Sequence, residues 1–190
     1  MELKTPLCEK SIRKLKVGDI VYISGKIVTA RDRAHERALK RGKFPEDIEN
    51  GIIFHSGPIV KKIDNKWEII SIGPTTSSRM NKLEVEFIER FKIKGIVGKG
   101  GMNNKVKDAM KGKVVYLAMT GGCSAIAAKS VKDVKRVHWL DVGVPEAVWV
   151  LEVEKLGPLI VGIDSKGNSL YEFVWNKIRE NLGEILKNEG

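Results

Sequence analysis

Three short apolar runs in this chain each lead into a loop rich in glycine or hydroxyl residues, and each loop leads into a helical pattern. The loops span residues 73–78, 98–101 and 120–122. A buried strand followed by such a loop and a helix is the repeating unit of α/β layers, in which the loops gather at one edge of the sheet. The repetition therefore predicts an α/β fold that presents several loops on one edge.

Hydrophobic periodicity in the first third of the chain fits the same fold class. Alternating apolar residues predict a strand over residues 20–28 that is broken at Gly25. A helix follows over residues 33–40, and Gly42 ends it. Two apolar runs flank Asp64-Asn65, which predicts a hairpin.

The last third of the chain predicts a second hairpin and a long helix. Residues 148–153 and 159–163 alternate well, so we expect them to pair with each other around residues 155–158. The helix is predicted over residues 169–187. It is expected to pack on the body of the protein through four apolar side chains, Phe173, Ile178, Leu182 and Ile185.

Length and composition indicate a soluble globular protein, because 42% of its 190 residues are hydrophobic and 31% are charged. No domain boundary is visible, so residues 1–190 are expected to form a single domain. No apolar run reaches the roughly 18 residues of a membrane span, and residues 1–10 lack the apolar core of a signal peptide. We therefore expect a cytoplasmic protein with no membrane partner.

Cys8 and Cys123 are the two cysteines of the chain. They form neither a disulfide framework nor a CxxC pair, and two thiolates cannot supply an ordinary zinc or iron–sulfur site. We therefore expect no metal ligands here, and any cluster that the protein uses must be held mainly by another chain. Cys123 lies at a predicted helix start, where a thiol can be reactive. The alternative is a small, partly buried side chain.

The formal net charge of +10 suits nucleic acid or a small anionic ligand, and a lysine-rich composition also suits a hot environment. The lysines are spread along the chain, only 6% of residues are aromatic, and no nucleic-acid-binding signature is present. We therefore expect no nucleic-acid partner, and we assign most of the excess charge to solvated surface lysines.

The densest set of anion-binding groups lies in the segment Gly-Pro-Thr-Thr-Ser-Ser-Arg-Met, residues 73–80. Hydroxyl residues before a helix expose backbone N–H groups at the positive end of the helix dipole. Arg79 adds a guanidinium fork that matches a carboxylate. The alternative is an ordinary serine-capped helix. The loop over residues 98–102 is also an anion cradle in principle, but it lacks the spacing of a Walker A loop.

Arg31 lies at a predicted strand-to-helix junction, from which its side chain can reach a shared cleft. The alternative is a local surface ion pair with Asp32. His35 follows one helical turn later, and we interpret it as a packed or capping residue because no second ligand has suitable spacing nearby. His55 follows a predicted strand, where both a functional role and a structural hydrogen bond in the turn are consistent with the sequence.

Five short segments occur in a fixed order: Thr29-Ala30-Arg31-Asp32-x-Ala34-His35, His55-Ser56-Gly57-Pro58, Gly73-Pro74-Thr75-Thr76-Ser77-x-Arg79-Met80, Gly98-Lys99-Gly100-Gly101-Met102 and Gly121-Gly122-Cys123-Ser124-Ala125. Together they resemble the beta subunit, or the equivalent C-terminal domain, of class I iron–sulfur fumarate hydratases and L-tartrate dehydratases. The resemblance covers residues 15–175, nearly the whole chain.

This resemblance implies a swivelling β/β/α domain and a partner alpha subunit in which three cysteines hold a [4Fe-4S] cluster, together forming an α2β2 hetero-oligomer. In this family the beta part closes over the cluster and binds a dicarboxylate. Carried over by position, Arg31, Arg79 and Lys99 bind substrate, while Thr75 and Thr76 are catalytic. A threonine hydroxyl is a weak base unless a neighbour takes its proton. We expect that neighbour to come from the alpha subunit, and we place the base at Thr75.

The activity implied by the resemblance is the reversible hydration of fumarate to L-malate. One alternative is the beta subunit of an L-tartrate dehydratase, which converts tartrate to oxaloacetate, because pocket detail decides the preference for one added hydroxyl. The other alternative is a stand-alone anion-binding or nucleic-acid-binding module that uses the charge of +10.

Overall fold

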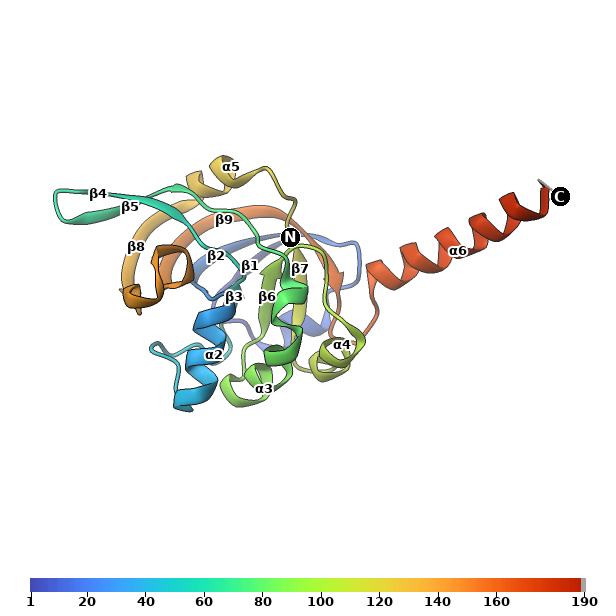
Figure 1. Cartoon of the computed structure of the whole chain (residues 1–190), viewed down its shortest axis with the longest axis horizontal. Helices are drawn as coiled ribbons and strands as arrows, with labels where there is room; N and C mark the ends of the chain where they lie inside the picture. Colours follow the sequence, from blue (N-terminus) through green and yellow to red (C-terminus); the bar gives the residue numbers. More distant parts are fainter. Residues whose placement is uncertain (189–190) are drawn as a thin grey trace.

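The computed structural model describes residues 1–188 and has a mixed α/β fold (Figure 1). The strands are β1 (Glu2–Lys4), β2 (Ile20–Thr29), β3 (Ile52–Phe54), β4 (Ile59–Ile63), β5 (Lys66–Ser71), β6 (Gly95–Gly98), β7 (Val115–Ala118), β8 (Val131–His138) and β9 (Val148–Ile163). The helices are α1 (Glu9–Arg13), α2 (Asp32–Arg41), α3 (Asn81–Phe91), α4 (Asn104–Met110), α5 (Ser124–Lys129) and α6 (Leu170–Asn188), and the 3-10 turns are η1 (Ser77–Met80), η2 (Leu140–Val142) and η3 (Val144–Glu146).

The main sheet closes into a barrel. Strands β2, β3, β6 and β7 are neighbours in that order, and β9 pairs with both β7 and β2. Strand β1 adds to β2 and β8 adds to β9, while β4 and β5 form a separate hairpin. Closure satisfies backbone groups that an open sheet leaves unpaired at its edges.

The direction of the strands determines where the loops lie. Strands β2, β3, β6 and β7 run parallel, whereas β9 runs antiparallel to both of its barrel neighbours. Parallel strands place their carboxyl ends at one edge, so the segments that follow them meet there. The prediction of an α/β fold with several loops on one edge is therefore confirmed.

The predicted hairpin between residues 148–153 and 159–163 is wrong, because β9 is one continuous strand of 16 residues. Lys155 and Gly157 have positive φ angles of 51° and 155°. They coincide with register shifts against β2 and do not reverse the chain. The first half of β9 also pairs with β8, and its last residues pair with β7. The two alternating runs in the sequence are therefore two parts of β9 that pair with different strands.

Two apolar clusters lie on the two faces of the barrel wall. Neighbouring residues such as Ile96 and Val97, or Tyr116 and Leu117, belong to different clusters, because successive side chains of a strand point to opposite faces. One cluster draws on all the barrel strands and fills the barrel. The other joins the outer face to helices α2, α3 and α4, which lie together on one side of the sheet (Figure 1).

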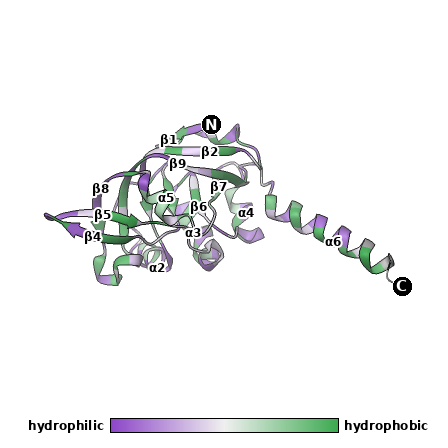
Figure 2. Ribbon diagram, turned by 90° about the horizontal axis from the view of Figure 1, so that it is seen from above, coloured by the Kyte–Doolittle hydropathy of each residue, from purple (hydrophilic) through white to green (hydrophobic). Residues whose placement is uncertain are grey.

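The C-terminal helix does not pack as its apolar spacing predicted. Helix α6 extends away from the body (Figure 1), and apolar and polar segments alternate along it (Figure 2). Its first turn is held by an ion pair between Lys107 and Glu172 and by the stacking of Tyr171 against Tyr116. The four side chains expected to be buried are about half or more exposed: Phe173 65%, Ile178 48%, Leu182 53% and Ile185 53%. Helical spacing shows that apolar residues share a face, but not what covers that face.

The local predictions near the N-terminal end of the chain are mostly confirmed. Helix α2 ends at Gly42, which adopts the left-handed conformation with φ 66°. Asp64 and Asn65 both have positive φ, as the tight hairpin turn between β4 and β5 requires. Gly25 does not break β2, because its φ of 104° accompanies a register shift within a continuous strand. Among residues 1–188, no helix combines the length and apolar character needed to cross a membrane.

Trp149 and Trp175 provide a test of this packing. Trp149 is fully buried, stacks edge-on against Trp67 and donates from its indole Nε1–H to the Val144 carbonyl at 2.9 Å, whereas Trp175 is 62% exposed. We expect Trp149→Ala to lower the free energy of unfolding by about 3–5 kcal/mol. Trp175→Ala is expected to change it by less than about 0.5 kcal/mol. Urea denaturation of both variants measures the difference, and equal losses would contradict the described position of α6.

Glu46 joins the connector after α2 to strand β8. Its carboxylate accepts hydrogen bonds from Arg136 Nη2–H at 2.9 Å and from His138 Nε2 at 2.8 Å. The hydrogen bond from Arg136 is the main reason that the pKa of Glu46 falls from 4.5 to about 2. The ionised carboxylate is therefore favoured in the folded state.

This lowered pKa predicts how stability depends on pH. The contribution of Glu46 is fully present above its unfolded pKa near 4.5, and it is lost as the pH falls toward about 2. We expect Glu46→Gln to be less stable than the parent protein at pH 6, with a difference that shrinks steadily below pH 4.5. Denaturation at a series of pH values measures this, and a difference independent of pH would contradict it.

Candidate functional site

The candidate site lies at the edge where the parallel barrel strands end. Arg31 follows β2, His55 follows β3, and Lys99 follows β6. The glycine loop that precedes α5 follows β7 at the same edge. Four segments that are far apart in the sequence therefore meet because their strands are neighbours in one sheet.

The segment over residues 73–80 reaches this edge from the hairpin and pairs with the loop after β6. The backbone N–H of Ser77 donates to the Lys99 carbonyl at 2.9 Å, and the N–H of Lys99 donates to the Thr75 carbonyl at 3.3 Å. Thr76 and Lys99 form an isolated parallel bridge. The structure therefore brings Thr75, Thr76 and Lys99 together, as the resemblance implied.

The predicted anion site at the helix start requires correction. The N–H of Thr75 donates to the His55 carbonyl at 2.7 Å, and that of Ser77 is also bound within the protein. These two N–H groups are therefore not available to a ligand. The alternative of a serine-capped helix is also wrong, because neither Thr76 before η1 nor Met80 before α3 makes a side-chain cap hydrogen bond.

The side chain of Lys99 lies beside the glycine loop that follows β7. A Cβ atom at Gly121 would lie 3.6 Å from Lys99 Nζ, and one at Gly100 would lie 3.6 Å from the methyl group of Thr76. In the next residues, the Cys123 thiol donates to the Thr120 carbonyl at 2.9 Å, and its side chain packs on the barrel core. Cys123 is therefore a partly buried residue that supports this loop.

Arg31 and Arg79 each form an ion pair with a carboxylate of the chain itself. Arg79 Nη2 lies 3.0 Å from Asp32 Oδ2, and Arg31 Nη2 lies 3.0 Å from Glu146 Oε1. The predicted local pair between Arg31 and Asp32 is therefore wrong, because each takes a distant partner. The Nε atom of Arg31 is buried and has no hydrogen-bond partner among the described residues. Arg31 thus retains donor capacity at this edge.

Three fully buried ionisable side chains lie under these loops. Glu84 Oε2 lies 3.4 Å from His35 Nε2 and 3.3 Å from His55 Nε2. The Nδ1 atom of His35 lies 2.9 Å from the Arg31 carbonyl and the side chain is fully buried, so the expectation of a packed histidine is confirmed, although His35 does not cap α2. The expectation that no second potential metal ligand lies near His35 was wrong, because the fold brings His35, His55 and Glu84 together. The spacing of residues 35, 55 and 84 in the sequence gives no sign of this cluster.

The charges in this cluster depend on one another. Burial opposes ionisation of Glu84, but the two histidines outweigh burial and hold the pKa of Glu84 at about 2. Burial also lowers the pKa of His35, but the carboxylate of Glu84 outweighs it, and the pKa of His35 rises. For His55 burial prevails, so its pKa is lowered. These shifts favour the ionised form of Glu84, the protonated form of His35 and the neutral form of His55.

A chain of hydroxyl groups extends from His55 toward the loop after β6. Ser77 Oγ lies 2.9 Å from His55 Nδ1 and accepts from the Tyr116 hydroxyl at 3.0 Å. The Tyr116 oxygen accepts in turn from the Gly101 N–H at 3.3 Å. Burial raises the pKa of Tyr116, so its hydroxyl stays protonated and can donate. Ser77, which the sequence suggested as a helix cap, is a buried connector.

The donor set does not fit an iron–sulfur cluster. Cys8 is exposed at the start of α1, and Cys123 lies in the loop between β7 and α5. A cluster needs three or four thiolates on one site. Within residues 1–188, the one group with the spacing of a metal site is His35, His55 and Glu84. This chain alone therefore does not supply the ligands of a cluster.

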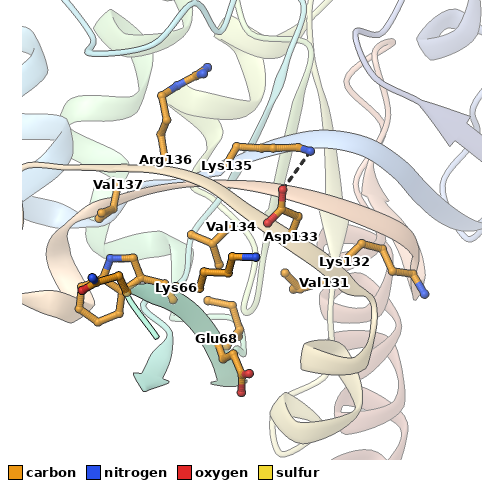
Figure 3. Close-up of a pocket in the computed structure, with 12 residues that line it drawn as sticks. Lys66, Glu68, Val131, Lys132, Asp133, Val134, Lys135, Arg136 and Val137 are labelled. Atoms are coloured by element: carbon orange, nitrogen blue, oxygen red, sulfur yellow. Dashed lines mark ion pairs between the residues drawn. The ribbon is translucent and has the colours of Figure 1, made fainter. Parts of the chain in front are cut away.

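A groove elsewhere on the surface contains none of the predicted site residues. It runs between the hairpin strand β5 and strand β8 and is lined by residues 65–69 and 131–137 (Figure 3). Its charges are mixed, and Lys135 pairs with Asp133 at 3.0 Å. The cations of the candidate site lie instead at the open strand edge.

The fold and this edge define a class of protein: an α/β barrel domain in which the segments of Arg31, Thr75, Thr76, Arg79 and Lys99 meet where the parallel strands end. The sequence profile of the family described as "Fumarase C-terminus" matches residues 1–174. The chain therefore belongs to this family.

Several relatives are similar over most of the chain. A "Putative L(+)-tartrate dehydratase subunit beta" of Methanocaldococcus jannaschii is 52% identical over 186 residues, which cover 95% of each chain. The "L(+)-tartrate dehydratase subunit beta" of Escherichia coli K12 is 43% identical, covering 88% of this chain and 85% of the relative. A "Putative fumarate hydratase class I" of Geobacillus stearothermophilus is 39% identical over 96% of this chain, which corresponds to only 36% of that relative.

Gly98 offers a test of how the two loops fit together. A Cβ atom at this position would lie 1.9 Å from Ser77 Oγ and 3.1 Å from the Tyr116 hydroxyl oxygen. We expect Gly98→Ala to lower the free energy of unfolding by about 1–3 kcal/mol, because the buried hydroxyls must shift. Gly183→Ala is the control, since no atom lies within 4 Å of its Cβ position. Unchanged stability of Gly98→Ala would contradict the described contact.

Proposed function

We propose that this chain is the beta subunit of a hydro-lyase that dehydrates L-tartrate to oxaloacetate. The observation that carries the proposal is the similarity to tartrate dehydratase beta subunits over 88–95% of this chain. The fumarate hydration implied by the five sequence segments becomes the second candidate. It is favoured by the family description and by the fumarate hydratase relative, which is 39% identical.

In this proposal Arg31, Arg79 and Lys99 bind the two carboxylates of the substrate. Guanidinium groups match carboxylates through paired N–H donors, and an ammonium group adds a point charge. All three side chains belong to segments that meet at the carboxyl edge of the barrel. Removal of a proton beside a carboxylate places more negative charge on that carboxylate in the transition state, and fixed cations stabilise this charge.

We assign Thr75 and Thr76 to catalysis, with Thr75 as the base that takes a proton from the substrate. Its backbone is fixed on both sides, since its N–H donates to the His55 carbonyl and its carbonyl accepts from Lys99. A hydroxyl acts as a base only when another group removes its proton. We place that group on the partner subunit.

The proposal requires an alpha subunit that holds the [4Fe-4S] cluster, because this chain has only two cysteines. When bound, the cluster supplies Lewis-acid assistance to the departing hydroxyl. We further propose that residues 1–190 act as one swivelling β/β/α domain that closes over the partner, in an α2β2 assembly. The open edge of the barrel suits this arrangement, since its cations lie at the surface of the chain and not in a closed cavity.

The role of Arg79 is tested in the enzyme assembled anaerobically from both subunits. Arg79 is half exposed and pairs only with Asp32 among the described residues, so Arg79→Ala is expected to leave the fold intact. We expect turnover to fall by about 100-fold or more, because a carboxylate contact is lost. Arg90→Ala is the matched control, since Arg90 forms a surface pair with Glu86 on α3, and we expect this variant to keep the turnover of the parent enzyme. Retained activity of Arg79→Ala would remove Arg79 from the site.

The same assembled enzyme decides between the substrates. Turnover of L-tartrate without turnover of fumarate supports the first candidate, and the reverse supports the second. Failure of the subunits to associate would contradict both and would favour a stand-alone anion-binding or nucleic-acid-binding module.

A further inference from the structure

The buried cluster of His35, His55 and Glu84 has a defined arrangement of protons. His35 Nδ1 lies 2.9 Å from the Arg31 carbonyl. A carbonyl can only accept, so this nitrogen carries a proton. The other ring nitrogen of His35 lies 3.4 Å from Glu84 Oε2. An unprotonated nitrogen would repel the carboxylate there, so His35 carries protons on both nitrogens.

The second histidine, His55, carries its proton on Nε2 and has an unprotonated Nδ1. His55 Nε2 lies 3.3 Å from the same carboxylate oxygen, so its proton belongs on Nε2. Its Nδ1 is then an acceptor for the Ser77 hydroxyl at 2.9 Å. Tyr116 donates to Ser77, and the Gly101 N–H donates to Tyr116. From Gly101 to His55 each donor therefore has an acceptor, whereas His35 Nε2, His55 Nε2 and the Glu84 oxygens are buried at ion-pair distance and form no closer hydrogen bond among the described residues.

This network contacts each segment that carries a proposed substrate-binding or catalytic residue. His35 is bound to the Arg31 carbonyl, and the His55 carbonyl accepts the N–H of Thr75. Ser77 lies next to Thr76 and is bonded to Lys99. All three cluster side chains are 0% exposed, so none can contact substrate directly.

We propose that His35, Glu84 and His55 are positioning residues for the reaction. Glu84 keeps His35 protonated, and the network holds Arg31, the Thr75–Thr76 segment and the loop of Lys99 at fixed relative positions. This inference rests on the proposed function. It adds a buried hydrogen-bond network with a defined direction of proton donation. This network sets the distance between the groups that bind the two carboxylates of a C4 substrate.

The charged groups around His35 support a single protonation state. His35 faces Glu84 on α3 and His55 after β3. Asp32, on the same helix as His35, also favours its protonated form. Asp32 is itself paired with Arg79 at 3.0 Å. The remaining face of the ring is covered by Phe87, with ring centroids 4.2 Å apart. Glu84 is thus the group whose removal changes the charge of His35.

Glu84→Gln and Ser77→Ala test the proposal in the assembled two-subunit enzyme, assayed on L-tartrate and fumarate. Glu84→Gln removes the counter-charge of His35, and Ser77→Ala interrupts the chain from His55 with a smaller structural change. Displacement of binding groups by about 1 Å lowers rates by about 100-fold. We expect kcat/KM to fall by about this factor in Glu84→Gln and by a smaller factor in Ser77→Ala.

Asp164→Asn is the matched control for loss of a buried carboxylate. Asp164 is 2% exposed and accepts from the Lys166 N–H, and it directly follows β9, whose last residue pairs with the start of β7 at the edge of the barrel opposite the site. We expect it to lower stability and leave kcat/KM unchanged. An equal loss of kcat/KM in Asp164→Asn and Glu84→Gln would reduce the cluster to a structural role and overturn the proposal.

Nitrogen-15 NMR of the full chain provides a readout that does not depend on activity. We expect His35 to be protonated on both nitrogens and His55 on Nε2 alone at pH 7, with His35 losing its Nε2 proton in Glu84→Gln. A neutral His35 in the parent protein, or a divalent metal ion bound stoichiometrically by the three side chains, would overturn the proposal. An unaltered kcat/KM in Glu84→Gln would also overturn it while the proposed function stands. A parent enzyme inactive on both substrates would instead contradict the proposed function itself.

Discussion

The pairing of β9 with both β2 and β7 is the constraint on which the arrangement of the molecule depends. Each partner of β9 lies at one end of the row of parallel strands, so the antiparallel strand joins the ends of that row and closes it. Closure fixes the order of β2, β3, β6 and β7, and with it the order of the segments that leave their carboxyl ends. The position of Arg31 relative to Lys99 therefore follows from backbone hydrogen bonds in the barrel wall and not from any direct contact between their side chains.

A second level of order is added below this edge. The loop backbones are joined to each other, as between Ser77 and Lys99, and buried polar side chains tie the same segments to helices α2 and α3. Buried polar groups are stabilising only when their hydrogen-bonding capacity and charge are matched. The short distances between Glu84 and the two histidines allow opposite charges to offset one another, which reduces the cost of burying this cluster.

The sequence was sufficient to predict much of this molecule. The repeated strand–loop–helix unit predicted the fold class and the meeting of loops at one edge, because both follow from local periodicity. The motifs predicted that Thr75, Thr76 and Lys99 lie together. Contacts between residues far apart in the sequence could not be predicted in this way. The pairing of Arg31 with Glu146, the continuity of β9 and the solvent exposure of Ile178 all depend on which distant segment lies nearby, and no local pattern carries that information.

The same limit explains why Glu84 was not identified. It lies on an amphipathic helix among other acidic residues, and its sequence neighbours give no indication that it is fully buried. Its role depends on two histidines from different strands and helices. The only available signal was its spacing of four residues from Met80 and from Ile88, which places a carboxylate on the apolar side of the helix, where an unpaired charge is rarely found.

The ion pairs of Arg31 with Glu146 and of Arg79 with Asp32 have a consequence for ligand affinity. Each arginine already pairs with a carboxylate of the protein itself, and under the proposed function a dicarboxylate takes the place of that partner. Ligand entry is then an exchange of one carboxylate for another, and the arginines remain oriented throughout. The gain in electrostatic energy is correspondingly small, so such a site binds its ligand weakly, distinguishes ligands by shape more than by charge, and releases product readily.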